Sequence, residues 1–308
     1  MINRNLIRIR VVQMVYSWYQ NTNKDLQGAE KELINSLQKS YDLYYYMLLL
    51  MVQLTKTYEN RVEAKRNKLM PTEEDLSPNM RLIDNEFIIQ LRDNIQFNKY
   101  LAERPMTWEN NDPFVKNLLD AILASDLYRE YADSNTTSYD TDKEFWVKTF
   151  KKFIYLNEEL DELLEDECIY WNDDVEIVQG FVMKTMKRFS KETGNEQALL
   201  PMFKDETDKQ YAIKLFHEVI LNEKEYRTLI DRHVSKWDLD RISFMDLVVM
   251  QIALAEIITF DSIPISVSLN EYIEIAKSYS TPKSGLFING ILDAIVGKLK
   301  ADNRIFKQ

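Results

Sequence analysis

The chain has 308 residues, of which 45% are hydrophobic, with only 6 glycines and 7 prolines. This is ample apolar material for one large domain or two, and the scarcity of turn residues disfavours sheet-rich folds and favours an all-α protein. The net charge of −11 argues weakly against a nucleic-acid binder, and the single cysteine, Cys168, excludes an internal disulfide framework and suits a reducing cytosol.

The N-terminal segment, residues 5–19, has apolar side chains at helical spacing and is predicted to form a helix. Arg4, Arg8 and Arg10 accompany it, and the first 20 residues contain no acidic side chain. Arginine suits phosphate because its guanidinium forks onto phosphate oxygens, and several arginines together release counterions. A charged, solvated helix start is the alternative interpretation of the same three residues.

The middle of the chain reads as a series of helices. The aromatic run at 41–50 could stack bases but is better explained as a buried helix. The carboxylates of 158–167 are interpreted as a solvated helix face, because their spacing fits no calcium loop. A loop is expected at 133–142, and helices are expected at 29–69 with room for one break, 82–101, 114–131, 145–164 and 173–190.

The C-terminal part is expected to contain helices at 208–221, 225–233 and 243–258, the last being the most buried. Two further helices flank a break at 279–285. Ser268 and Glu271 have the spacing of a capping box for the first of them. The second is predicted to open at Ser284-Gly285, and Gly290 inside it suggests a close approach of two backbones.

Charge is unevenly distributed along the chain. Residues 21–200 hold 22 basic and 34 acidic residues, whereas residues 275–308 hold six basic residues and two acidic ones. The two ends of the chain are therefore basic and the middle is acidic.

Several chemistries have no signature in this sequence. It lacks glycine-rich phosphate loops and the GxSxG nucleophile motif. His217, His233 and Cys168 do not have zinc-site spacing, and Cys168 lacks the cationic neighbours that activate a thiol. No apolar run approaches the ~18 residues of a membrane span, and no secretory signal is visible. We therefore expect a cytoplasmic protein that is not an enzyme and that has no metal or cofactor.

A resemblance to a known family lies near the C-terminus. The runs PISVSLNEYIEIAKSY and KSGLFINGILD, within residues 262–293, resemble the C-terminal signature of the NusB family of transcription antitermination factors. Residues 237–242, the helix at 246–258 and the arginine-bearing residues 4–18 are similar to other parts of that family. The resemblance implies a NusB-like helical bundle made of residues 1–20 and 201–308, with an additional acidic helical insertion domain at 21–200.

The resemblance also implies a function. NusB proteins bind the boxA element of ribosomal-RNA transcripts together with NusE, a small-subunit ribosomal protein, and help RNA polymerase resist termination. Phe287, near the first turn of the last helix, could stack an unpaired base, which is how single-stranded RNA is usually recognised, and a core position beside Ile288 and Ile291 is the alternative. The residues that correspond to the RNA surface of the family are Arg4, Arg8, Arg10, Gln13, Tyr16, Lys277, Ser280, Lys283, Ser284, Phe287 and Asn289.

Two departures from the family pattern leave an alternative open. The arginine run is thin, with Asn5 and Leu6 at positions that are often basic, and the chain is about twice the usual family length. The alternative is a helical protein-interaction module that keeps the NusB-like fold without RNA binding. A NusB-like domain fronting a ribosomal-RNA methyltransferase is disfavoured, because the chain ends soon after the motif and has no glycine-rich cofactor loop.

Overall fold

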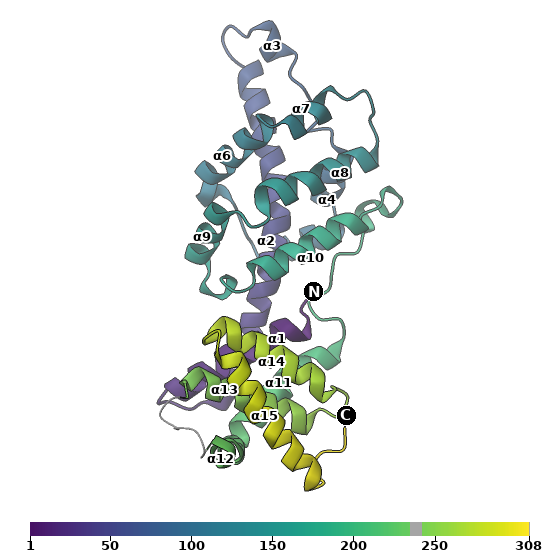
Figure 1. Cartoon of the computed structure of the whole chain (residues 1–308). Coiled ribbons are helices and arrows are strands. Elements are labelled where there is room, and N and C mark those ends of the chain that lie inside the picture. The colour runs from purple at the N-terminus through teal and green to yellow at the C-terminus, as the bar shows by residue number, and fades with distance from the viewer. Residues whose placement is uncertain (235–241, 308) are drawn as a thin grey trace. The chain divides into compact units, whose positions relative to one another are not determined.

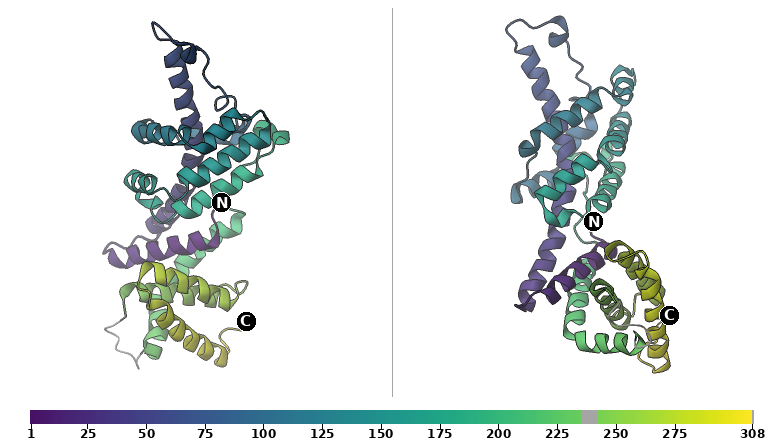
Figure 2. Two further views of the ribbon diagram at one scale, coloured as in Figure 1. Left: turned by 45° about the horizontal axis from the view of Figure 1, so that its top comes forward. Right: turned by 60° about the vertical axis from the view of Figure 1, so that its left-hand side comes forward.

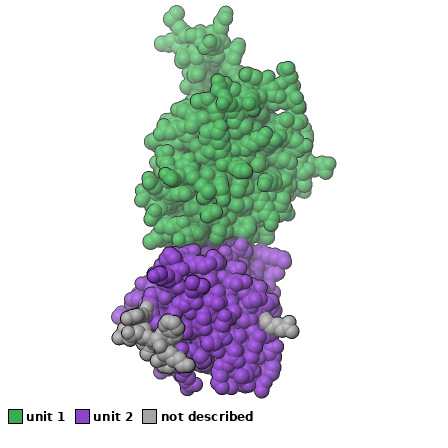
Figure 3. Space-filling model, viewed as in Figure 1, with its two compact units in different colours: residues 1, 38–202 green, residues 2–37, 203–308 purple. Residues whose placement is uncertain are grey.

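The computed structural model describes residues 1–234 and 242–307, and within these ranges all the regular elements are helices (Figure 1). The all-α prediction is therefore confirmed. The chain divides into two compact units (Figure 3): unit 1 contains Met1 and residues 38–202, and unit 2 contains residues 2–37 and 203–308.

Unit 2 is built around one apolar helix, α13 (Phe244–Thr259), in which all residues from Asp246 to Ile257 are buried. A helix that is apolar on every side must be covered on every side. As the sequence predicts, α13 is the most buried helix of this half, and α14 and α15 lie side by side next to it (Figure 2). The helices that pack on α13 are α1 (Arg4–Gln20), α11 (Glu206–Leu221), α12 (Glu223–Val234), α14 (Ile265–Tyr279) and α15 (Ser284–Ala301).

Unit 1 is organised around the aromatic stretch of α2 (Leu26–Arg66). Tyr45 stacks on Tyr100 with ring centroids 3.7 Å apart, and Tyr46 stacks on Trp108 at 4.1 Å. The prediction that residues 41–50 form a buried helix is thus confirmed. The other helices of unit 1 are α3 (Glu73–Leu76), α4 (Glu86–Arg92), α5 (Ile95–Glu103), α6 (Asp112–Leu123), α7 (Asp126–Asp133), α8 (Tyr139–Thr149), α9 (Glu158–Glu167) and α10 (Val175–Arg188), with short turns at Glu109–Asn111, Phe150–Ile154, Ile169–Trp171 and Lys191–Glu196.

The structure divides several helices that the sequence pattern joins. The run at 82–101 is two helices, because the side chain of Asn94 accepts the Phe97 N–H and starts a new helix. The run at 145–164 is interrupted by a π-helical turn at Phe150–Ile154 and by Leu156, whose φ is +54°. The expected loop at 133–142 ends early, because a capping box at Ser138 starts α8.

Two local predictions at the C-terminus are wrong. α14 begins at Ile265 directly after Pro264, so Ser268 lies inside the helix and caps nothing. A Cβ added at Gly290 would meet no atom within 4 Å, whereas one at Gly285 would lie 3.1 Å from the stem of Lys277. The close approach of α14 and α15 is therefore at Gly285. Residues 237–241 of the family-like segment lie outside the described residues.

Candidate nucleic-acid interface

Helix α1 carries the N-terminal arginines, and the side chain of Asn3 caps its start by accepting the Leu6 N–H at 2.9 Å. Arg8 points into unit 2. Its Nε and Nη2 donate to the two carboxylate oxygens of Glu256, each at 2.9 Å, and the Arg8 side chain is only 4% exposed. This is a bidentate ion pair inside the core of the unit.

Glu256 accepts three more hydrogen bonds: from the hydroxyl of Tyr211, from Ser268 at 2.7 Å and from Tyr272 at 3.0 Å. Burial alone would raise the pKa of this carboxyl, but the hydrogen bonds and charge of Arg8 outweigh it and hold the pKa below its usual value. The same partner raises the pKa of Arg8, although burial opposes it. The pair is therefore charged, and it fixes α1 against α13 and α14.

The other two arginines of α1 lie in different surroundings. Arg4 is half-exposed, 3.4 Å from the Asp208 carboxylate and above the ring of Tyr211. Arg10 is buried, and its Nη1 donates to Gln13 at 2.7 Å. Of the three, Arg4 has the most accessible guanidinium, whereas Arg8 and Arg10 are held within the unit.

Gln13 joins the two ends of the chain. Its Nε2 donates to the hydroxyl of Tyr279 at 3.3 Å, across 266 positions of sequence. The next residue, Ser280, lies 2.9 Å from the hydroxyl of Ser243, the N-cap of α13. The structure thereby brings Arg10 and Gln13 together with the turn between α14 and α15.

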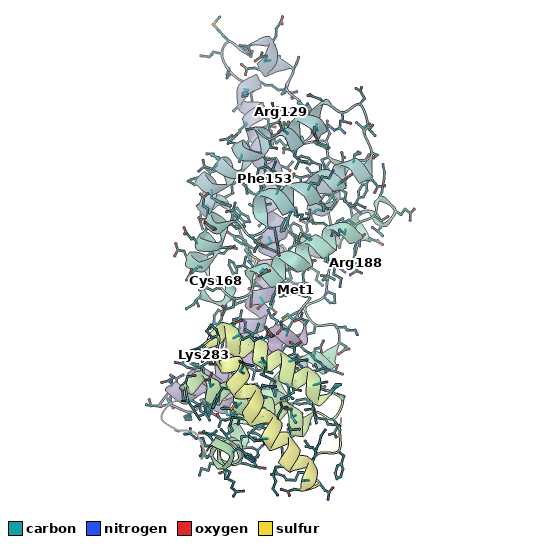
Figure 4. The ribbon with its side chains drawn as sticks, in the orientation of Figure 1. Met1, Arg129, Phe153, Cys168, Arg188 and Lys283 are labelled. Carbon is teal, nitrogen blue, oxygen red and sulfur yellow. The ribbon has the colours of Figure 1, made fainter. Side chains whose placement is uncertain are left out.

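That turn is held by hydroxyl groups. Ser284 donates to Asp246 at 3.2 Å, lies 3.1 Å from Ser280, and accepts the backbone N–H of Thr281. Lys283 is exposed at the N-cap of α15 and makes no side-chain cap (Figure 4). An uncapped helix start presents N–H groups and the positive end of the helix dipole, a combination that suits an anion such as phosphate.

The remaining predicted positions lie around this turn. Lys277 is exposed on the last turn of α14, pairs with Glu274 at 2.6 Å and passes over Gly285. Phe287 and Asn289 are half-buried on the first two turns of α15. Lys277 is therefore placed beside the turn by its contact with Gly285, and Phe287 and Asn289 follow it along α15.

The predicted residue Tyr16 has an aromatic neighbour, Phe244, that no sequence motif indicates. Tyr16, which is 38% exposed, meets the ring of Phe244 edge-on at 5.3 Å, and Tyr19 meets it at 6.2 Å. Phe244 is itself 38% exposed as the first residue of α13. The Ser243 cap marks Phe244 as the first residue of the helix, but the exposure of its ring is set by tertiary packing.

The family assignment comes from comparison with known proteins. Residues 173–297 match the model described as the NusB family. A protein of Salinibacter ruber named Transcription antitermination protein NusB is 37% identical over 132 residues, which are 41% of this chain and 82% of that protein. The chain belongs to the NusB family. No solved structure is significantly similar to it.

Two more NusB relatives match shorter stretches. Proteins of the same name from Chloroherpeton thalassium and Finegoldia magna are each 42% identical, over 99 and 88 residues. These stretches are 32% and 27% of this chain, and 47% and 64% of those relatives. The family match begins at residue 173, earlier than the boundary at 201 expected from the sequence, and it includes α10 of unit 1.

The described residues contain neither a candidate membrane-spanning helix nor a candidate metal-binding cluster. None of their helices has the length and apolar character needed to cross a membrane. Among the same residues, no group of three or more His, Cys, Asp or Glu side chains is placed to hold a metal ion.

Proposed function

We propose that this NusB family member is a transcription antitermination factor. It binds boxA-like single-stranded RNA of ribosomal-RNA transcripts together with NusE, as part of an RNA polymerase antitermination complex in the cytoplasm. Family membership supports the general role. The observation that carries the RNA-binding role is the Gln13–Tyr279 contact, because it unites the two basic ends of the chain on one part of unit 2.

The chemistry of this part of unit 2 suits an unpaired RNA strand. Tyr16 and Phe244 are exposed aromatic side chains, and single-stranded RNA is commonly bound by stacking its bases on such rings. Lys277 and Lys283 supply positive charge, and the start of α15 supplies backbone N–H groups for a phosphate. We include Arg4, Gln13, Ser280, Ser284, Phe287 and Asn289 in the proposed surface.

Arg8 and Arg10 have a different role in this proposal. Arg8 is buried and paired with Glu256, and Arg10 supports Gln13, so both act as positioning residues that hold α1 in place. Replacing Arg8 would remove RNA binding by disturbing the fold, which would not identify a contact. The variants that test the surface are therefore made at exposed side chains.

The test is a titration of boxA-like RNA at two salt concentrations, with and without NusE. We expect binding that weakens with salt and strengthens with NusE. Lys283→Ala should weaken binding several-fold and lower the salt slope by about one, since one phosphate contact is lost. Lys300→Ala is the matched control, an exposed lysine in the last turn of the same helix. Equal effects of the two substitutions would refute the assignment of the surface.

A second candidate function rests on the charge of unit 1. Residues 38–202 hold 20 basic and 31 acidic residues, and two of the three N-terminal arginines are buried. These observations favour a protein-interaction module that keeps the fold and lacks RNA affinity. It predicts no RNA binding near physiological salt and a tight protein partner that survives ribonuclease treatment.

A further inference from the structure

A groove lies in unit 1 beside the start of α9, far in sequence from the proposed RNA surface. Its volume is about 520 Å³, within the range of pockets that enclose bulky groups. The groove is lined by apolar side chains from α6 and from residues 153–156, and its charged lining residues are Lys152, Glu158 and Glu159. The apolar lining is Phe114, Leu118, Ala121, Phe153 and Leu156, and Figure 4 labels Phe153.

Leu156, in the wall of the groove, has a left-handed backbone conformation that is unfavourable for leucine. Its φ of +54° is a conformation that costs a leucine roughly 1–2 kcal/mol, and its side chain is 55% exposed. Gln179 of α10 maintains this turn, since its amide oxygen accepts the Leu156 N–H at 3.1 Å and its Nε2 donates to Ile154 at 3.3 Å. The fold therefore presents an apolar side chain to solvent at the edge of an apolar groove.

The surface next to the groove is strongly acidic. After Lys151 and Lys152, which in the sequence lie on the opposite side of the groove's chain segment from α9, residues 153–183 contain ten acidic residues and no lysine or arginine. Glu158, Glu162 and Glu165 are exposed and recur at helical spacing along one face of α9, and Asp166 joins them. Among the described residues, none of these four carboxylates forms an ion pair. This row begins at the groove, because Glu158 is also one of the groove's lining residues.

We propose that this groove and the acidic face of α9 form a docking site for a lysine- or arginine-rich amphipathic helix of another protein. A partner helix laid along α9 repeats its side chains with the same period, so cations three and four residues apart meet Glu158, Glu162 and Glu165. One bulky apolar side chain of the partner enters the groove against Phe153 and Leu156. The charge of this face repels RNA and anionic membranes, which leaves a basic protein segment as the complementary occupant.

The test uses the full chain and a labelled synthetic peptide about four helical turns long, with leucines on one face and lysines on the other. A counterpart with glutamates in place of the lysines controls for apolar binding. We expect the basic peptide alone to bind, and to bind more weakly at about 300 mM salt than at about 50 mM, because screening shortens the reach of the carboxylates.

The decisive variant is Leu156→Asn, which removes the apolar side chain and puts a residue that tolerates positive φ at this position. We expect folding to be preserved or stabilised and peptide affinity to fall about tenfold, by loss of a buried apolar contact. Leu76→Asn is the matched control, because Leu76 is also 55% exposed in unit 1. It should leave peptide affinity unchanged.

The charge contribution is tested by a triple change of Glu158, Glu162 and Glu165 to glutamine, which should weaken binding about tenfold. The same change at the exposed residues Glu73, Glu74 and Glu130 should have a much smaller effect. Basic-peptide affinity that Leu156→Asn leaves intact would overturn the proposal, as would the absence of binding at low salt. A dimer of the chain that Leu156→Asn dissociates would overturn it in favour of self-association.

Discussion

In each unit of this NusB family member a buried carboxylate is bound by an arginine fork, and the two pairs differ in how exposed the arginine is to water. In unit 2 both partners are inside: the side chains of Arg8 and Glu256 are 4% and 0% exposed. In unit 1 Asp42 is 7% exposed, but Arg104 is 38% exposed, although both of its bonds to Asp42 are 2.6 Å long. Breaking the pair should therefore cost less stability in unit 1 than in unit 2, because solvent screens a charge that it can reach.

The largest loss of stability is expected when Glu256 is replaced. Glu256→Ala would leave the buried Arg8 guanidinium with only the half-exposed carboxylate of Glu271, 3.5 Å away, and we expect a loss of about 3–5 kcal/mol in the free energy of unfolding. Chemical denaturation followed by circular dichroism would measure it. The double variant Arg8→Met with Glu256→Leu should recover most of the loss, since it leaves no buried charge. A single variant within about 1 kcal/mol of wild type would contradict this account.

A smaller effect is expected from Arg104→Ala. Asp42 keeps the hydroxyl of Tyr100, which donates to it at 2.6 Å, and water can replace the exposed guanidinium. We expect a loss of about 1–2 kcal/mol in the same denaturation experiment. Arg129→Ala, which removes an ion pair exposed on both sides, serves as the control and should change stability by less than about 0.5 kcal/mol. A loss at Arg104 as large as that at Glu256 would show that exposure does not separate the two pairs.

The smallest expected effect is on the pH dependence of the free energy of unfolding. In the unfolded chain the pKa of Glu256 is about 4.3, and in the folded protein it is lower. The carboxylate therefore contributes its full stabilisation at pH values above the unfolded pKa. The contribution is lost as the pH falls through the folded pKa, because the unfolded state then binds the proton more readily. We expect the unfolding free energy of Glu256→Gln to fall less steeply than that of wild type between about pH 5 and pH 3. Parallel profiles would argue that Glu256 is not the linked group.

Much of unit 2 could be predicted from the sequence because it follows from local patterns. The apolar periodicity of α1 and α15 and the continuous apolar run of α13 locate these helices to within a few residues of their observed ends. The Arg8–Glu256 pair could not be predicted, since its partners are 248 positions apart and a lone glutamate in an apolar run has no local signature. The same pair explains the mistaken capping box, because Ser268 donates to Glu256 and Glu271 lies 3.5 Å from Arg8.

The groove of unit 1 could not be predicted from the sequence either, because it also depends on a contact between residues far apart in the chain. Residues 145–164 have a continuous amphipathic pattern, and nothing local marks the interruption at Leu156. The interruption depends on Gln179, a residue of a different helix, whose amide replaces the backbone bonds that a continuous helix would have made. For the proposed RNA surface, the sequence identified Tyr16 but not its aromatic neighbour Phe244, whose exposure is set by tertiary packing.

Because Arg8 and Glu256 are 248 positions apart, Arg8 is synthesised long before its partner. A ribosome adding about 5–20 residues per second needs on the order of tens of seconds to make Glu256 after it has made Arg8. Throughout that interval the apolar side of α1 has no α13 to cover it, whereas residues 38–202 are complete earlier and can fold as they emerge. Nascent chains of this protein should therefore be recognised by chaperones through their first helix, and released once α13 has left the exit tunnel.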